Sequence, residues 1–198
     1  MTSLTPVNDF YGVCKRNGIL LDTNMLILYI VGQSGEEAVK SEPLLHSAKH
    51  KHTWDDFKVV KQLVDISATR RFFFTPFSTP EVSHLLDMEQ NHQRYKTSKP
   101  HKYHKGIMEA LCSGAEISNP TRNILQKHEH LLEQFGITDL SIIHAATHSE
   151  EPVAVLSDDE LLCNLLQSNN LPAISLARMN ALGIRNQNLI ARMNAFIM

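Results

Sequence analysis

The chain has 198 residues, a mass of 22.4 kDa and a formal net charge of −2, and 42% of its residues are hydrophobic. This composition suits one domain and excludes a fully disordered or collagen-like chain. The longest purely apolar run, Met25 to Val31, is much shorter than the ~20 residues of a membrane-spanning helix, and no secretory signal is visible at the N-terminus. Three widely spaced cysteines without a Cys-x-x-Cys motif indicate reduced thiols. We therefore expect a cytoplasmic protein without a membrane partner.

Short apolar segments alternate with helical patterns along the chain. Strands are predicted at four of these segments: residues 18–21, 72–75, 153–156 and 172–175. Helices are predicted after the break at Asp22, over residues 54–66, from 78, over 106–134 with interruptions, from 136, from 157 and from about 186. This alternation indicates an α/β domain whose parallel sheet is covered by helices on both faces.

Two polar segments interrupt the pattern. Residues 33–53 predict a surface insertion. Residues 91–106 contain no acid and five cations: Arg94, Lys96, Lys99, Lys102 and Lys105. Together with Tyr95 and Tyr103, these cations suit contact with single-stranded RNA, and they equally suit a solvated charge run. With a pI near 6.6, any contact with nucleic acid depends on such a local patch.

Eleven histidines raise the question of a transition-metal site. Two groups lie in polar stretches with interspersed lysines: His46, His50 and His52, and His101 and His104. Such a setting favours a solvated loop over a specific site. We interpret His128 and His130, which lie among charged residues, as surface side chains, and His144 as a partly buried one.

Carboxylates fall at four junctions that lead into predicted helices: Asp22, Glu81, Asp139 and Asp159. Because ligands of open parallel sheets bind outside the carboxyl ends of the strands, we expect these side chains to converge on one cleft. Carboxylates brought together repel one another unless a cation compensates. Oxygen ligands without cysteine or paired histidines favour Mg²⁺ or Mn²⁺, and one or two such ions suit attack on phosphorus.

Each acid also has a purely structural interpretation. Ser157-x-x-Glu160 and Ser78-x-x-Glu81 both fit a capping box, and Thr138 is a suitable N-cap residue for the helix that contains Asp139. A carboxylate in the first turn stabilises a helix by ~0.3–1 kcal/mol. Asp22 fits this interpretation least, because an unpaired carboxylate between an apolar strand and an apolar helix is costly to desolvate.

Four motifs, taken in order, resemble those of the PIN-domain family of small metal-dependent nucleases, which includes the VapC-type toxins. They are Leu20-Leu-Asp-Thr-Asn24, Thr75-Pro-x-x-x-x-Glu81-Val-Ser-x-Leu-Leu86, Thr138-Asp-x-x-x-x-His-Ala-Ala146 and Val155-Leu-Ser-Asp-Asp-x-x-Leu162. With the elements between them, they cover residues 18–176. The resemblance implies a three-layer α/β/α sandwich with a mainly parallel sheet, in a single PIN-like domain of residues 1–198.

Carried over residue by residue, the resemblance assigns catalysis and metal binding to the four junction acids, Asp22, Glu81, Asp139 and Asp159. It assigns supporting hydrogen bonds to Asn24 and Ser157. The family's fourth motif reads Thr/Ser-x-Asp, which selects Asp159, although the neighbouring Asp158 leaves the register open. The implied activity is that of an endoribonuclease, which hydrolyses RNA phosphodiester bonds with Mg²⁺ or Mn²⁺ through a metal-activated water. In a prokaryotic or phage setting, its role would be that of a toxin or defence nuclease restrained by an antitoxin-like partner.

The chain departs from compact family members by its length and by the insertion near 33–53, and these departures weaken a standard VapC role. The alternative is a non-catalytic PIN-like module that binds RNA or a protein. A DNA-directed nuclease of the flap type is less favoured, because neither a helical arch nor a DNA-binding helix pair is evident. Family members often form homodimers, and the terminal residues Leu189, Ile190, Met193 and Phe196 either form such an interface or close the core.

Overall fold

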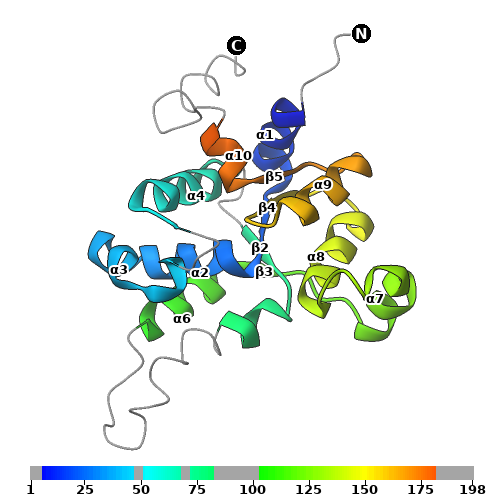
Figure 1. Cartoon of the computed structure of the whole chain (residues 1–198), viewed down its shortest axis with the longest axis horizontal. Helices are drawn as coiled ribbons and strands as arrows, with labels where there is room; N and C mark the ends of the chain where they lie inside the picture. Colours follow the sequence, from blue (N-terminus) through cyan, green and yellow to red (C-terminus); the bar gives the residue numbers. More distant parts are fainter. Residues whose placement is uncertain (1–5, 47–50, 68–71, 83–102, 182–198) are drawn as a thin grey trace, which may run out of the picture.

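A five-stranded parallel sheet forms the centre of the molecule (Figure 1). The computed structural model describes residues 6–46, 51–67, 72–82 and 103–181. The strands are β1 (Ile19–Leu21), β2 (Phe72–Phe74), β3 (Ala115–Glu116), β4 (Ala154–Ser157) and β5 (Ala173–Ser175), in the order β3-β2-β1-β4-β5. All four pairings are parallel. The predicted α/β class is confirmed, and so are the four predicted strands.

The helices alternate with the strands as expected, and several elements are additional to those predicted. They are α1 (Pro6–Asn17), α2 (Thr23–Gly32), α3 (Glu36–Ser41), η1 (Pro43–His46), α4 (Trp54–Ile66), α6 (His104–Ser113), α7 (Thr121–His128), η2 (Glu129–Leu131), α8 (Ile137–His148), α9 (Glu160–Ser168) and α10 (Leu176–Ala181). A further helix begins at Ser78. The predicted elements include none of α1, α3, η1, α10 and β3. The helix α10 and the two-residue strand β3 are too short to show a period.

The three layers follow from the alternation of side chains along each strand. Ile19 and Leu21 of β1 pack on one side with α1, α2, α3, α4, α6 and α10. Leu20 packs on the other side with α7, α8 and α9. The same division holds for Leu156 and Val155 of β4. The sheet therefore lies between two layers of helices, in agreement with the α/β/α sandwich that the resemblance implied.

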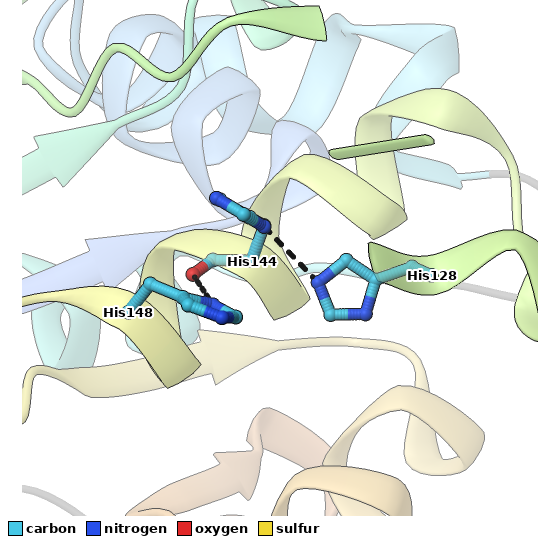
Figure 2. Close-up of side chains that lie close together, drawn as sticks. All are labelled: His128, His144 and His148. Atoms are coloured by element: carbon cyan, nitrogen blue, oxygen red, sulfur yellow. Dashed lines mark hydrogen bonds between the residues drawn. The ribbon is translucent and has the colours of Figure 1, made fainter. Parts of the chain in front are cut away.

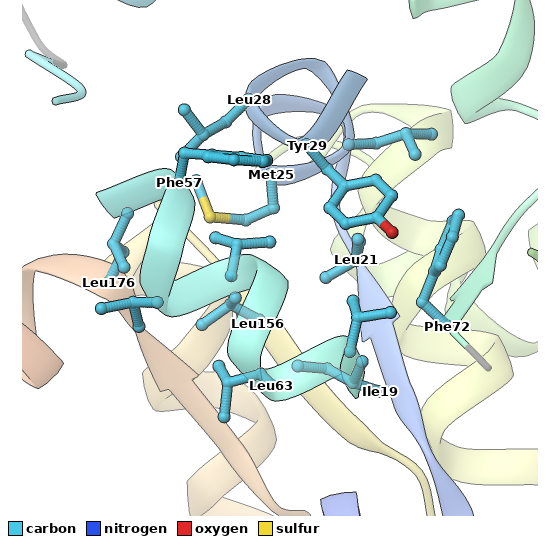
Figure 3. Close-up of a cluster of buried hydrophobic side chains, with 14 of the residues drawn as sticks. Ile19, Leu21, Met25, Leu28, Tyr29, Phe57, Leu63, Phe72, Leu156 and Leu176 are labelled. Atoms are coloured by element: carbon cyan, nitrogen blue, oxygen red, sulfur yellow. The ribbon is translucent and has the colours of Figure 1, made fainter. Parts of the chain in front are cut away.

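Helix α2 is the most deeply buried element of the first layer. Nine of its ten residues are buried, which explains why its sequence is apolar on every side. A Cβ atom added to Gly32 would lie 2.0 Å from the ring of Phe57 in α4, so glycine permits the close approach of the two helices. Figure 3 shows Phe57 of α4 beside Met25 and Leu28 of α2.

The segment predicted as a surface insertion contributes to the core. Val39 of α3 and Leu45 of η1 are fully or almost fully buried. Buried Glu42 accepts a hydrogen bond of 2.5 Å from the hydroxyl of Tyr103. The expectation of a solvated loop is wrong for these side chains, because a few apolar residues in a polar segment are enough to anchor it.

Several predicted residues lie outside the described part of the chain. These are Arg94, Lys96, Lys99 and Lys102 of the basic segment, and Leu189, Ile190, Met193 and Phe196 near the C-terminus. Lys105 belongs to α6. Among the described helices, none is long and apolar enough to cross a membrane.

Candidate functional site

A cavity of about 410 Å³ opens at the carboxyl ends of the strands. It is lined by Asp22, Thr23, Asn24, Glu81, Asp139, Asp158, Asp159, Glu160 and Leu161. The cavity includes all four predicted acids and two further carboxylates. Its floor lies between β1 and β4, which are neighbours in the sheet. After β1 the chain forms β2 on one side of this pair, and after β4 it forms β5 on the other side. This is the switch point of a doubly wound sheet, where ligands of such folds bind.

Asp22 is the innermost acid. It follows β1 and caps α2, since its Oδ1 accepts a 2.8 Å hydrogen bond from the backbone N–H of Met25. Its Oδ2 accepts a 3.1 Å bond from the backbone N–H of Asp158. The side chain is buried, and burial raises its pKa from 3.8 to about 6, although these hydrogen bonds act in the opposite direction. An ionised Asp22 is therefore costly unless a cation lies nearby.

Ser157, at the end of β4, connects two of the acidic residues. Its buried hydroxyl donates a hydrogen bond to Oδ2 of Asp22 and accepts one of 2.9 Å from the backbone N–H of Asp159. These contacts agree with the supporting role expected for this residue. The second residue with that expected role, Asn24, lines the cavity with an exposed side chain, which makes no hydrogen bond to another described residue.

Glu81 reaches the cavity from the helix that begins at Ser78. Its Oε2 accepts a 2.9 Å hydrogen bond from the hydroxyl of Thr23 at the start of α2. The expected capping box of Ser78 and Glu81 is therefore not formed, because Thr23 is the partner of the carboxylate. The bond to Thr23 joins two strand-to-helix junctions directly.

Asp139 lies in the first turn of α8, whose N-cap is Gly136 and not the expected Thr138. Burial, followed by the charge of Asp159, raises the pKa of Asp139; the charge of Glu81 contributes in the same direction.

A network of buried hydroxyls holds α8 against the end of β2. The hydroxyl of Thr75 lies 2.7 Å from that of Ser141 and 3.3 Å from that of Ser78. The network thus fixes Asp139 relative to the junction that leads to Glu81.

Asp158 and Asp159 both line the cavity, but they have different partners. Asp159 is the N-cap of α9, and its Oδ1 accepts bonds from the backbone N–H groups of Leu161 (2.7 Å) and Leu162 (3.2 Å). The capping box predicted from Ser157 and Glu160 is therefore wrong. Oδ2 of Asp159 takes part in neither bond. Oδ2 of Asp158 lies 2.7 Å from Nε2 of His52.

The set of donors around the cavity fits a hard divalent cation. Six carboxylates line it, and no described lining residue is Lys or Arg. Carboxylate oxygens are the ligands preferred by Mg²⁺, and Mn²⁺ accepts the same set. Asp22, Glu81, Asp139 and Asp159 could hold such an ion, since each comes from a different junction and contributes at least one oxygen.

Two of the histidine interpretations are wrong. His52 and His128 are buried, being 5% and 7% exposed, although both lie among polar residues in the sequence. His144, expected to be partly buried, is almost fully buried, and its Nδ1 lies 3.2 Å from Nε2 of His128 (Figure 2). The spacing of His144 and His148, four residues apart on one helix, is the sequence signal for this cluster, because such residues lie on the same helix face.

Comparison of the chain with protein-family models, with curated proteins and with solved structures found no match. The α/β/α fold and the acidic cavity therefore rest on the structure alone, and the resemblance to PIN domains stays a prediction.

Proposed function

We propose that the acidic cavity binds Mg²⁺ or Mn²⁺ and that the protein is a metal-dependent endoribonuclease. The observation that carries this proposal is the convergence of carboxylates from four junctions on one cavity at the switch point of the sheet. Helix capping explains the position of one carboxylate oxygen of Asp22 and of one carboxylate oxygen of Asp159. It does not explain why Glu81 and Asp139 lie in the same cavity.

In this proposal the acids divide into ligands and supporting groups. Asp22, Glu81, Asp139 and Asp159 hold one or two ions, while Ser157 and Thr23 orient Asp22 and Glu81 through their hydroxyls. Asp158, whose carboxylate is turned to His52, supports the wall of the cavity. A bound divalent ion supplies Lewis-acid chemistry to hydrolysis, because it polarises a phosphate and lowers the pKa of a water.

RNA is the proposed substrate on the strength of the PIN-like motifs. An acidic cavity needs nearby cations to tolerate a polyanion, and the basic segment 91–106 is the candidate for that contact. A toxin or defence role in the cytoplasm, an inhibitory antitoxin-like partner and a homodimer belong to the same resemblance and are proposed with it.

The test is a cleavage assay with labelled single-stranded RNA and DNA, in Mn²⁺ or EDTA. Asp139→Asn is compared with Glu133→Gln, which removes an exposed acid outside the cavity. We expect cleavage of RNA that requires metal and that falls by roughly a hundredfold or more in Asp139→Asn alone. Equal cleavage by the two variants would contradict the proposal. Metal binding without cleavage of any substrate would favour the non-catalytic binding module.

A further inference from the structure

A cluster of three histidines lies between α7 and α8, on the side of the sheet opposite to α2 and α4. His144 and His148 belong to α8, and His128 is the last residue of α7 (Figure 2). Each side chain offers one ring nitrogen, and these nitrogens lie within 4.8 Å of one another. The cluster is separate from the acidic cavity, since His144 and His148 follow Asp139 by roughly 8 and 13 Å along the helix.

We propose that His128, His144 and His148 form a binding site for a first-row transition-metal ion, with Zn²⁺ as the best match. Neutral imidazole nitrogens are ligands for Zn²⁺, Co²⁺ and Ni²⁺, whereas Mg²⁺ prefers oxygen. Three histidines leave one position of a tetrahedral ion open to water.

The two buried histidines already have the separation that such an ion requires. Ligand nitrogens about 2.0–2.1 Å from a tetrahedral ion lie roughly 3.3 Å apart. Nε2 of His128 and Nδ1 of His144 are 3.2 Å apart and share one proton in a hydrogen bond. An ion would replace that proton. Burial is the main cause that lowers the pKa of His128, and it lowers that of His144 to about 4, so both rings are neutral at pH 7.

His148 completes the set after a rotation of its exposed side chain. Its ring is now stacked on that of His144, with the ring centres 4.2 Å apart. Nδ1 of His148 lies 3.2 Å from the backbone oxygen of His144. A proton on Nδ1 can be donated to this carbonyl or to the hydroxyl oxygen of Thr147, which lies 2.7 Å away, and the lone pair then remains on Nε2, an arrangement common among metal-binding histidines.

The ion would fasten α7 to α8. Only Ile124 and His128 of α7 are buried, so this helix has few apolar anchors of its own. A bond from His128 to an ion shared with α8 would add a second anchor at its C-terminal end. The same segment leads through η2 to Gly136, where the helix of Asp139 begins.

The test uses the full chain, stripped with a chelator and titrated with Zn²⁺ by calorimetry and with Co²⁺ by visible absorption. His148→Ala removes an exposed ligand without opening the core, and His130→Ala, an exposed neighbour in η2, is its matched control. Asp139→Asn tests whether the ion binds at the acidic cavity instead. We expect a saturable Zn²⁺ site that persists in Asp139→Asn, the strong absorption of tetrahedral Co²⁺, and a loss of Zn²⁺ affinity at that site of roughly tenfold or more in His148→Ala alone.

Three results would overturn the proposal: no saturable Zn²⁺ binding, equal affinity in His148→Ala and wild type with Asp139 replaced by Asn in both, or a complete loss of Zn²⁺ binding in Asp139→Asn. Circular dichroism of each variant checks that it is folded. Zn²⁺ should also slow amide hydrogen exchange in α7 of the wild type but not of His148→Ala. Cleavage of RNA is not part of this test, so it can succeed or fail independently of the proposed nuclease activity.

Discussion

Nε2 of His52 lies 2.7 Å from Oδ2 of Asp158, and each side chain is only 6% exposed. His52 precedes α4, whereas Asp158 follows β4, so the contact joins positions about a hundred residues apart in the chain. It fixes the polar segment before α4 against the junction where three of the cavity's acidic residues, Asp158, Asp159 and Glu160, lie side by side. The predicted insertion thus forms part of the support of the candidate site.

Replacing His52 with alanine should destabilise the protein by roughly 2–4 kcal/mol, because Asp158 would lose a buried partner of its carboxylate. Denaturant unfolding measures this loss. Lys51→Ala is the control, since Lys51 is adjacent and exposed, and it should change stability by less than about 0.5 kcal/mol. Equal stability of the two variants would contradict the structural role of His52.

Ser157→Ala should weaken metal binding as well as stability. The variant loses the hydroxyl that connects Asp22 with the backbone of Asp159, at an expected cost of about 1–3 kcal/mol. Ser175 is a matched control because it is the register partner of Ser157 on β5, is also buried, and caps the next helix at Arg178. Ser175→Ala should cost about 1 kcal/mol and leave Mn²⁺ affinity unchanged. A similar Mn²⁺ affinity in both variants would argue against the role of Ser157.

Asp22→Asn should stabilise the metal-free protein at pH 7. A pKa of about 6 instead of 3.8 corresponds to about 3 kcal/mol of unfavourable charge burial. The pKa of about 6 already includes the opposing effect of the hydrogen bonds from Ser157, Met25 and Asp158. The expected gain is therefore about 3 kcal/mol at most, measured by denaturant unfolding in EDTA. A destabilised variant would show that the ionised carboxylate is well compensated without metal.

The advantage of Asp22→Asn should shrink as the pH falls. The folded wild type, with the raised pKa, binds a proton at Asp22 between about pH 6 and 4, where the unfolded chain does not. The stabilisation of the folded wild type by this proton is fully present below 3.8, the pKa of Asp22 in the unfolded chain, and is lost as the pH rises through about 6. Between pH 7 and pH 5 the difference between the two proteins should decrease by about 1 kcal/mol. Comparing them at each pH cancels the titration of all other groups, and a constant difference would contradict the raised pKa.

Much of the site could be predicted because its positions follow from chain topology. Asp22 and Asp139 lie at the starts of helices that long apolar stretches define, and parallel strands bring such starts to one edge. The structure places all four predicted acids at one cavity. The individual hydrogen bonds could not be predicted. Thr23, not Ser78, is the partner of Glu81, because the choice depends on how two helices approach in space.

The errors arise where local composition and tertiary contacts disagree. His52 and His128 lie among polar residues, yet both are buried by elements distant in the sequence. The edge strand β3 has two residues and pairs only with β2, so no pattern of its own distinguishes it from a loop. Such features depend on packing partners that periodicity does not identify.

Binding of Mn²⁺ to the acidic cavity is the central claim, and calorimetric titration of the chelator-stripped chain tests it most directly. Wild type and Glu133→Gln should bind Mn²⁺ saturably with equal affinity, because Glu133 is exposed outside the cavity. Asp139→Asn, which removes one lining carboxylate, should bind at least roughly tenfold more weakly. Absence of Mn²⁺ binding in the wild type, or equal affinity in all three proteins, would contradict the assignment of this cavity as a metal centre.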